Sequence, residues 1–156
     1  MASIDDERFM RAAIAEAVAA PATGDVPVGA VAVWRGEIVG QGRNEKELRC
    51  DPTAHAEMAA IRQAAECLCS WRLTSVTLYC TMEPCPMCAG AMVQARLGRL
   101  VYAVDDAKAG AAGSIVDLLR MPYLNHRVEV FRGVLAREVE SILKEFFSGL
   151  RAPARD

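Results

Sequence analysis

The sequence has no charge-free apolar run near the roughly 20 residues that a membrane helix needs, so we expect no membrane span. Met1–Arg11 carries Asp5, Asp6 and Glu7 instead of a basic patch before an apolar stretch, so no secretory signal is expected. The cytoplasm is therefore the expected compartment. With 18 Lys and Arg against 20 Asp and Glu, the net charge of −2 argues against broad, non-specific nucleic-acid binding, which needs many cations that displace counterions.

The cysteines do not indicate a disulfide framework. Six cysteines could form disulfides in a secreted protein, but in a reducing compartment metal binding is the better use of Cys85 and Cys88. The other four are expected to behave as small buried hydrophobes, and we assign no function to Cys50, Cys67, Cys69 and Cys80.

Alternating helices and strands are predicted along the chain, whose 156 residues suit one domain. Ser3 with Asp6 can cap the first helix, and Asp51 followed by Pro52 can start the second. This α/β pattern predicts a mixed sheet with helices on both faces. The expected strands are 28–34, 37–42, 76–82, 100–104 and 128–131, and the expected helices are 3–21, 51–67, 84–97, 115–120 and 135–151.

Two short segments carry the residues best suited to catalysis, His55-Ala-Glu57 and Glu83-Pro-Cys-Pro-Met-Cys88. One His and two Cys give a zinc ion three ligands and leave its fourth position open for water, as in catalytic zinc sites. Such a zinc ion lowers the pKa of its water from about 15.7 towards about 7. Glu57 would then act as general base and acid for the protons of this water. A structural zinc site has no need of such a carboxylate.

The spacing of these residues suits a site at two helix starts. Cys85 and Cys88 lie three apart at a predicted helix start, on one face, where the helix dipole favours thiolates. His55 and Glu57 would diverge by about 200° in mid-helix but can converge in a first turn. Helix starts that follow strands place the site at the carboxyl edge of the sheet.

Each residue taken alone has a plainer interpretation. A lone His55 is more often a satisfied histidine than a ligand, and Cys85 with Cys88 could be half of a structural zinc site or a redox pair. The joint pattern with Glu57 and the two prolines favours catalytic zinc.

The pattern H-x-E with P-C-x-x-C is that of the zinc-dependent nucleobase deaminases. The chain resembles the bacterial tRNA-specific adenosine deaminases in particular, from Phe9 to Arg151. Four segments carry this resemblance: Asp51–Glu57, Thr81–Met92, Gly110–Ser114 and Asn125–Glu129. The resemblance implies a three-layer α/β/α cytidine-deaminase-like fold with a central five-stranded mixed sheet. It also implies a single zinc-dependent deaminase domain over 1–156, with a short flexible tail at 152–156, one Zn²⁺ per subunit and a homodimer.

The resemblance implies hydrolytic deamination of adenosine to inosine at wobble position 34 of a tRNA anticodon, by zinc-activated water, with Glu57 as the catalytic residue. The expected partner is the anticodon stem-loop of an arginine tRNA. The metal ligands would be His55, Cys85 and Cys88. The implied substrate contacts are Asn44, the backbone of Ala56, Asp105, Lys108, Phe147 and Arg151.

Plainer interpretations of these contacts also stand. Asn44 is more often a turn residue, Asp105 and Lys108 would by default lie in a solvated loop, and Phe146 with Phe147 are expected to belong mostly to the core.

Two other functions remain open. A deaminase of free nucleobases or nucleosides, such as a guanine deaminase, shares the zinc motif, although the segments 110–114, 125–129 and 146–151 favour tRNA. A non-catalytic zinc-stabilised RNA-binding module would keep the fold without turnover, and the intact Glu57 argues against it.

Overall fold

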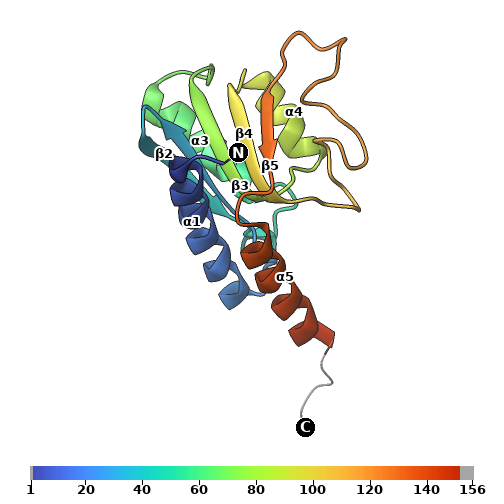
Figure 1. The fold of residues 1–156 in the computed structure, drawn as a ribbon. Helices are drawn as coiled ribbons and strands as arrows, with labels where there is room; N and C mark the ends of the chain where they lie inside the picture. Colours follow the sequence, from blue (N-terminus) through green and yellow to red (C-terminus); the bar gives the residue numbers. More distant parts are fainter. Residues whose placement is uncertain (1, 152–156) are drawn as a thin grey trace.

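The structure is a computed structural model that describes residues 2–151, so the expected tail at 152–156 lies outside the described residues. Its centre is a five-stranded sheet in the order β2-β1-β3-β4-β5 (Figure 1). β1 pairs antiparallel with β2 and β3, whereas β3, β4 and β5 run parallel. The mixed sheet predicted from the sequence is confirmed. The strands are β1 Gly29–Trp34, β2 Glu37–Arg43, β3 Val76–Met82, β4 Arg99–Val104 and β5 Glu129–Arg132.

One face of the sheet is covered by α1 (Ile4–Ala19) and α5 (Ala136–Arg151), as Figure 1 shows. The predicted cap of α1 is confirmed: the Asp6 amide donates to Ser3 Oγ at 3.0 Å, and the Ser3 amide donates to Asp6 Oδ2 at 3.1 Å. Asp6 is buried and also accepts hydrogen bonds from Arg99 Nη1 and Tyr79 Oη, both at 2.8 Å. These bonds, chiefly the one from Arg99, hold the pKa of Asp6 well below its usual range and tie α1 to β3 and β4.

The opposite face is covered by α3 (Ala56–Leu68) and α4 (Pro86–Gln94). Small residues let α3 approach the sheet closely: a Cβ on Gly40 would overlap the carbonyl oxygen of Ala60. Ala60 itself is fully buried. Because any side chain at Gly40 would push the helix away, this contact fixes the middle of α3 relative to the sheet.

The helix boundaries differ from the predictions at several points. The chain segment 51–53 forms a turn in which Asp51 Oδ1 accepts from the Thr53 amide at 2.8 Å and from Thr53 Oγ1 at 2.7 Å. The Asp51 side chain therefore closes its own turn instead of capping a helix, and α3 begins only at Ala56. α4 ends at Gln94 because Arg96 has a left-handed φ of 55°. A short helix that was not predicted, α2, spans Lys46–Arg49.

The helix expected over 115–120 is absent, and this prediction was wrong. The amides of Ile115 and Val116 both donate to the carbonyl of Gly110, at 2.9 and 3.3 Å, and the amide of Leu118 donates to Ala111 at 3.0 Å. These hydrogen bonds join residues five to seven apart, whereas an α-helix needs bonds between residues four apart. The segment therefore packs onto the preceding loop as a series of turns.

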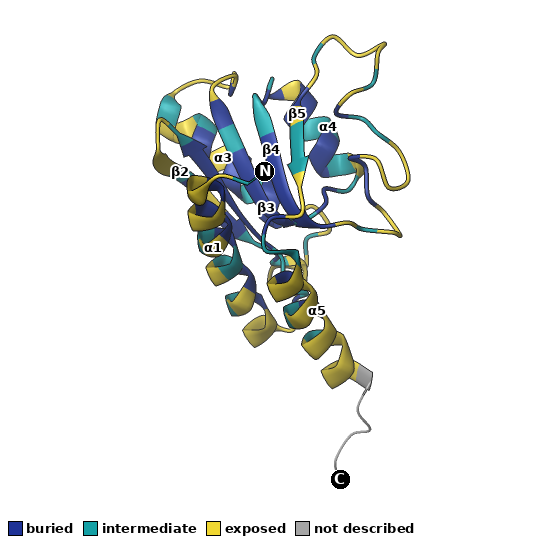
Figure 2. Cartoon of the chain, in the orientation of Figure 1, coloured by how far each residue is buried: buried dark blue, intermediate teal, exposed yellow. Residues whose placement is uncertain are grey.

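Two burial predictions were also wrong. The outer half of α5 is largely exposed (Figure 2), with Phe147 41% exposed, because this part of the helix extends beyond the sheet. Four cysteines were expected to be buried. Cys80 is buried, whereas Cys50, Cys67 and Cys69 are exposed. Within residues 2–151, none of the helices is long and apolar enough to cross a membrane.

Candidate active site

The three predicted metal ligands meet at one point. His55 Nδ1 lies 3.5 Å from Cys85 Sγ and 3.4 Å from Cys88 Sγ, and the three donor atoms all lie within 4.8 Å of one another. A tetrahedral site with bonds of about 2.0–2.3 Å has edges of roughly 3.4–3.8 Å. The spacing of the donor atoms therefore fits a single metal ion without a change of backbone.

Two helix starts produce this convergence. His55 immediately precedes the first residue of α3 and has an extended backbone (φ −86°, ψ 150°), and Cys85 holds the same position before α4 (φ −73°, ψ 172°). Because His55 is not yet helical, the angular divergence from Glu57 that mid-helix spacing would impose does not arise. The partial positive charge at the start of α4 favours the thiolate form of Cys85.

Glu57 lies beside the ligands, with its Oε2 3.9 Å from His55 Nδ1, and its side chain is buried. Burial raises the pKa of Glu57 above its usual value. The pKa of the Cys85 thiol is lowered to about 3, first by the hydrogen bond from Cys88 and also by His55. The pKa of Cys88 is raised because its thiol donates to Cys85 and is buried. The group thus combines a ready thiolate with a carboxyl able to exchange protons.

A cavity of about 240 Å³ opens onto this group. Asn44 and Ala56, both predicted to contact substrate, line it. The Asn44 side chain is fixed at both ends: Nδ2 donates to the Val26 carbonyl at 3.3 Å and Oδ1 accepts from the Lys46 amide at 3.3 Å. Ala56 is the first residue of α3, so its amide has no carbonyl within the helix to bind. The cavity is therefore lined by groups that can orient a polar ring.

The other predicted contacts lie outside this cavity. Asp105 is exposed and accepts from Arg132 Nη1 at 2.9 Å and from Tyr102 Oη at 3.2 Å, and Lys108 is exposed in the following turn. Phe147 lies on the exposed part of α5. Arg151 is the last residue of α5, and its side chain lies outside the described part of the structure.

Two acidic residues of the cavity wall were not predicted from the sequence, Asp106 and Glu83. Asp106 stands next to the predicted Asp105, and the sequence held no signal to decide which of the two adjacent acids lines the cavity. Glu83 belongs to the motif before Cys85, but the motif alone gave its carboxylate no partner.

Three ligands for a metal, an open cavity and a buried acid, at the carboxyl edge of a mixed sheet, are together the arrangement of a metal-dependent hydrolytic deaminase. The sequence profile of the MafB19-like deaminases matches residues 4–151. The tRNA-specific adenosine deaminase of Bacillus subtilis (strain 168) is 45% identical over 146 residues, which cover 94% of this chain and 91% of that protein. The chain belongs to the MafB19-like deaminase family.

Solved structures agree with this assignment. A tRNA:A34 deaminase, from a study of A-to-I editing at the wobble position of transfer RNA, has a TM-score of 0.83 and 41% identity, covering 87% of this chain and 99% of that one. A guanine deaminase from Bacillus subtilis has a TM-score of 0.62 and 32% identity and covers 96% of both chains. The three-layer deaminase fold expected from the sequence is confirmed.

Proposed function

We propose that this chain hydrolyses adenosine to inosine at wobble position 34 of a tRNA anticodon. One observation carries the chemistry: a buried glutamate, Glu57, stands beside three convergent metal ligands in an open cavity. The RNA substrate is supported by the similarity to tRNA-specific adenosine deaminases at 45% and 41% identity over most of the chain.

Zinc is the metal that we propose for the site. Two thiolates and an imidazole are ligands that zinc favours, and two thiolates cancel its formal charge. When bound by His55, Cys85 and Cys88, zinc would act as a Lewis acid that makes water a nucleophile at neutral pH.

Glu57 would move the protons of the reaction. Its buried carboxylate would accept a proton from the attacking water and deliver it to N1 of the adenine. It would then accept the proton of the new C6 hydroxyl group and pass it to the amino group, so that ammonia leaves and the C6 carbonyl of inosine forms. The raised pKa suits this role, since a carboxyl that binds protons more readily than usual can both accept and return them.

The cavity would hold the target base in an extruded position. We propose that the Asn44 side chain and the free amide of Ala56 contact the nucleoside, since both line the cavity. Asp105, Lys108, Phe147 and Arg151 would contact the RNA around it, where an exposed aromatic ring such as that of Phe147 suits stacking with unpaired bases.

We further propose a homodimer in the cytoplasm, acting on an arginine tRNA, with the whole chain forming one deaminase domain. The continuous five-stranded sheet supports one domain, and the remaining points rest on the similarity to tRNA-specific adenosine deaminases.

A guanine deaminase is the second candidate, favoured by the 32% identity to the Bacillus subtilis enzyme. That similarity is lower in identity and in TM-score than the similarity to the tRNA:A34 deaminase, 0.62 against 0.83. The RNA substrate is therefore the better supported of the two.

A position-specific assay tests this proposal. The zinc-loaded protein is incubated with an anticodon stem-loop that carries adenosine at position 34, and with a matched stem-loop in which that adenosine is moved to position 35. Inosine should form at position 34 of the first RNA and not in the second. Ammonia release from guanine without inosine in either RNA would contradict the proposal.

A further inference from the structure

One buried carboxylate outside the metal group organises a whole wall of the active-site cavity. Glu83 follows β3 and lies two residues before Cys85, and it is only 3% exposed. A buried carboxylate is costly unless several donors satisfy it. The donors that satisfy Glu83 come from the segment 105–114, which we call the wall loop.

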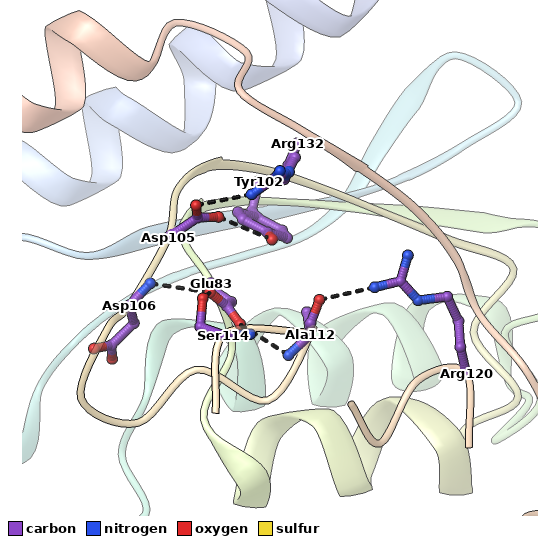
Figure 3. A network of polar contacts seen from close by, with 8 residues as sticks. All are labelled: Glu83, Tyr102, Asp105, Asp106, Ala112, Ser114, Arg120 and Arg132. Atoms are coloured by element: carbon purple, nitrogen blue, oxygen red, sulfur yellow. Dashed lines mark hydrogen bonds and ion pairs between the residues drawn. The ribbon is translucent and has the colours of Figure 1, made fainter. Parts of the chain in front are cut away.

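Both carboxylate oxygens of Glu83 accept hydrogen bonds from the wall loop (Figure 3). Oε1 accepts from the Asp106 amide at 3.0 Å and from the Ser114 hydroxyl, and Oε2 accepts from the amides of Ala112 at 3.0 Å and Ser114 at 3.2 Å. Hydrogen bonds to an ionised acceptor are stronger than neutral ones. Glu83 therefore holds both ends of the wall loop, and the loop has no regular secondary structure to hold it otherwise.

The chain is shaped around this carboxylate. A Cβ on Gly110 would overlap the Glu83 carboxyl group, so the loop can close over it only with glycine at this position. The neighbouring Pro84 carbonyl accepts from the Ala111 amide at 2.8 Å, which fixes the middle of the loop to the start of α4.

The anchored loop reaches the cavity at Asp106, whose Oδ1 also accepts from the amides of Lys108 and Ala109 at 3.0 and 3.2 Å. Asp106 and Glu83 line the same cavity as His55 and Glu57. The Glu83 amide donates to the Val104 carbonyl at 2.9 Å, so Glu83 is tied to β4 through its backbone and to the loop through its side chain. Its carboxylate thus joins the wall carrying Asp106 to the chain segment that carries the ligand Cys85.

We propose that Glu83 is a positioning residue that sets substrate affinity: it holds the wall loop so that Asp106 faces the bound nucleoside, and it takes no part in the proton transfers. This inference rests on the proposed function. A residue with a merely structural role would lower the amount of active enzyme and leave the KM of the remainder unchanged, whereas a loosened wall raises KM.

Glu83→Gln is the sharpest test because it keeps the size of the side chain. The glutamine side chain has one oxygen that accepts hydrogen bonds and one nitrogen that donates them. The nitrogen would face N–H or O–H donors of the wall loop, so the hydrogen bonds to that one position are lost. Ser114→Ala removes one of the donors and provides a milder second variant. Glu138→Gln is the matched control, since Glu138 is exposed and pairs with Arg11 on the opposite face of the sheet, at 3.0 Å.

Two measurements on the zinc-loaded full chain separate the possibilities. Hydrogen exchange reports on the wall loop without any substrate, and the amides of Asp106, Ala112 and Ser114 should exchange at least about tenfold faster in Glu83→Gln. Steady-state kinetics with the adenosine-34 stem-loop should show KM raised about tenfold or more, with kcat within about threefold of wild type and zinc content unchanged. Ser114→Ala should give exchange rates and a KM between those of wild type and Glu83→Gln. Glu138→Gln should match wild type in both measurements.

The outcomes distinguish this inference from the proposed function. Unchanged exchange in the loop, an unchanged KM, or a loss of kcat together with zinc would each overturn the positioning role of Glu83. If wild type deaminates guanine and not the stem-loop, the proposed function fails, and the same comparison of KM with guanine decides the role of Glu83. If Glu83→Gln does not fold, wild-type values for both measurements in Ser114→Ala would overturn the inference.

Discussion

Replacing Glu57 by glutamine should abolish turnover while leaving the metal in place. The substitution keeps the shape of a side chain that is 4% exposed, so it should leave no cavity and no strain. The proposed metal ligands are His55, Cys85 and Cys88, and none of them is altered. The single function removed is the capacity to accept and return a proton.

The size of the effect follows from the burial of the site. A positioned general acid or base contributes about 10²–10⁴ to the rate, and a factor of 10⁴ corresponds to about 5.5 kcal/mol. Glu57 would relay two protons in succession, one to N1 and one to the leaving amino group, and its burial keeps bulk water and buffer from replacing it. We therefore expect kcat to fall by about 10⁴, the upper end of the range.

The assay measures inosine formed in the adenosine-34 stem-loop under single-turnover conditions, together with zinc per chain. Glu66→Gln is the control, because Glu66 lies on the same helix, α3, but is exposed. It should behave as wild type in both measurements.

Two results would refute the reasoning. A kcat within tenfold of wild type in Glu57→Gln at full zinc content would remove Glu57 from the proton transfers. Loss of zinc in that variant would show that the carboxylate holds the metal site together instead of carrying protons.

Three further predictions test other parts of the structure. Cys85→Ala should lose most bound zinc and all activity, measured by metal analysis, and full zinc retention would exclude Cys85 as a ligand. Asp106→Ala should raise KM for the stem-loop more than Asp105→Ala does, and the reverse order would contradict the cavity geometry. Asp6→Asn should destabilise the fold by about 2 kcal/mol at pH 7 in denaturant titrations. Because the pKa of Asp6 is lowered in the folded state by Arg99, this difference should shrink as the pH falls below about 4 and the carboxylate protonates, and a difference that is constant with pH would refute it.

The convergence of His55 with Cys85 and Cys88 could be expected from the sequence because two short motifs carry these residues. Pro86 marks the start of α4 directly after Cys85, whereas the start of α3 was expected at residue 51 and lies at Ala56. The centre of the sheet was predictable because β1, β3 and β4 are largely apolar runs bounded by polar turns.

The errors concern segments whose structure depends on distant partners. The stretch 115–120 has the composition of a short helix, but its amides bond to Gly110 and Ala111 in a loop that is itself anchored on Glu83. The exposure of Phe147 follows from the length of α5 beyond the sheet, which the periodicity of the helix does not encode. Asp106 was missed because the choice between two adjacent acids depends on the same anchored loop.

The most direct test of the central claim is the ratio of kcat/KM for the adenosine-34 stem-loop to kcat/KM for guanine, measured with zinc-loaded and metal-stripped protein. The stem-loop should be preferred by at least about a hundredfold, and stripping the metal should abolish the activity until zinc is restored. A preference for guanine, or activity that survives removal of the metal, would contradict it.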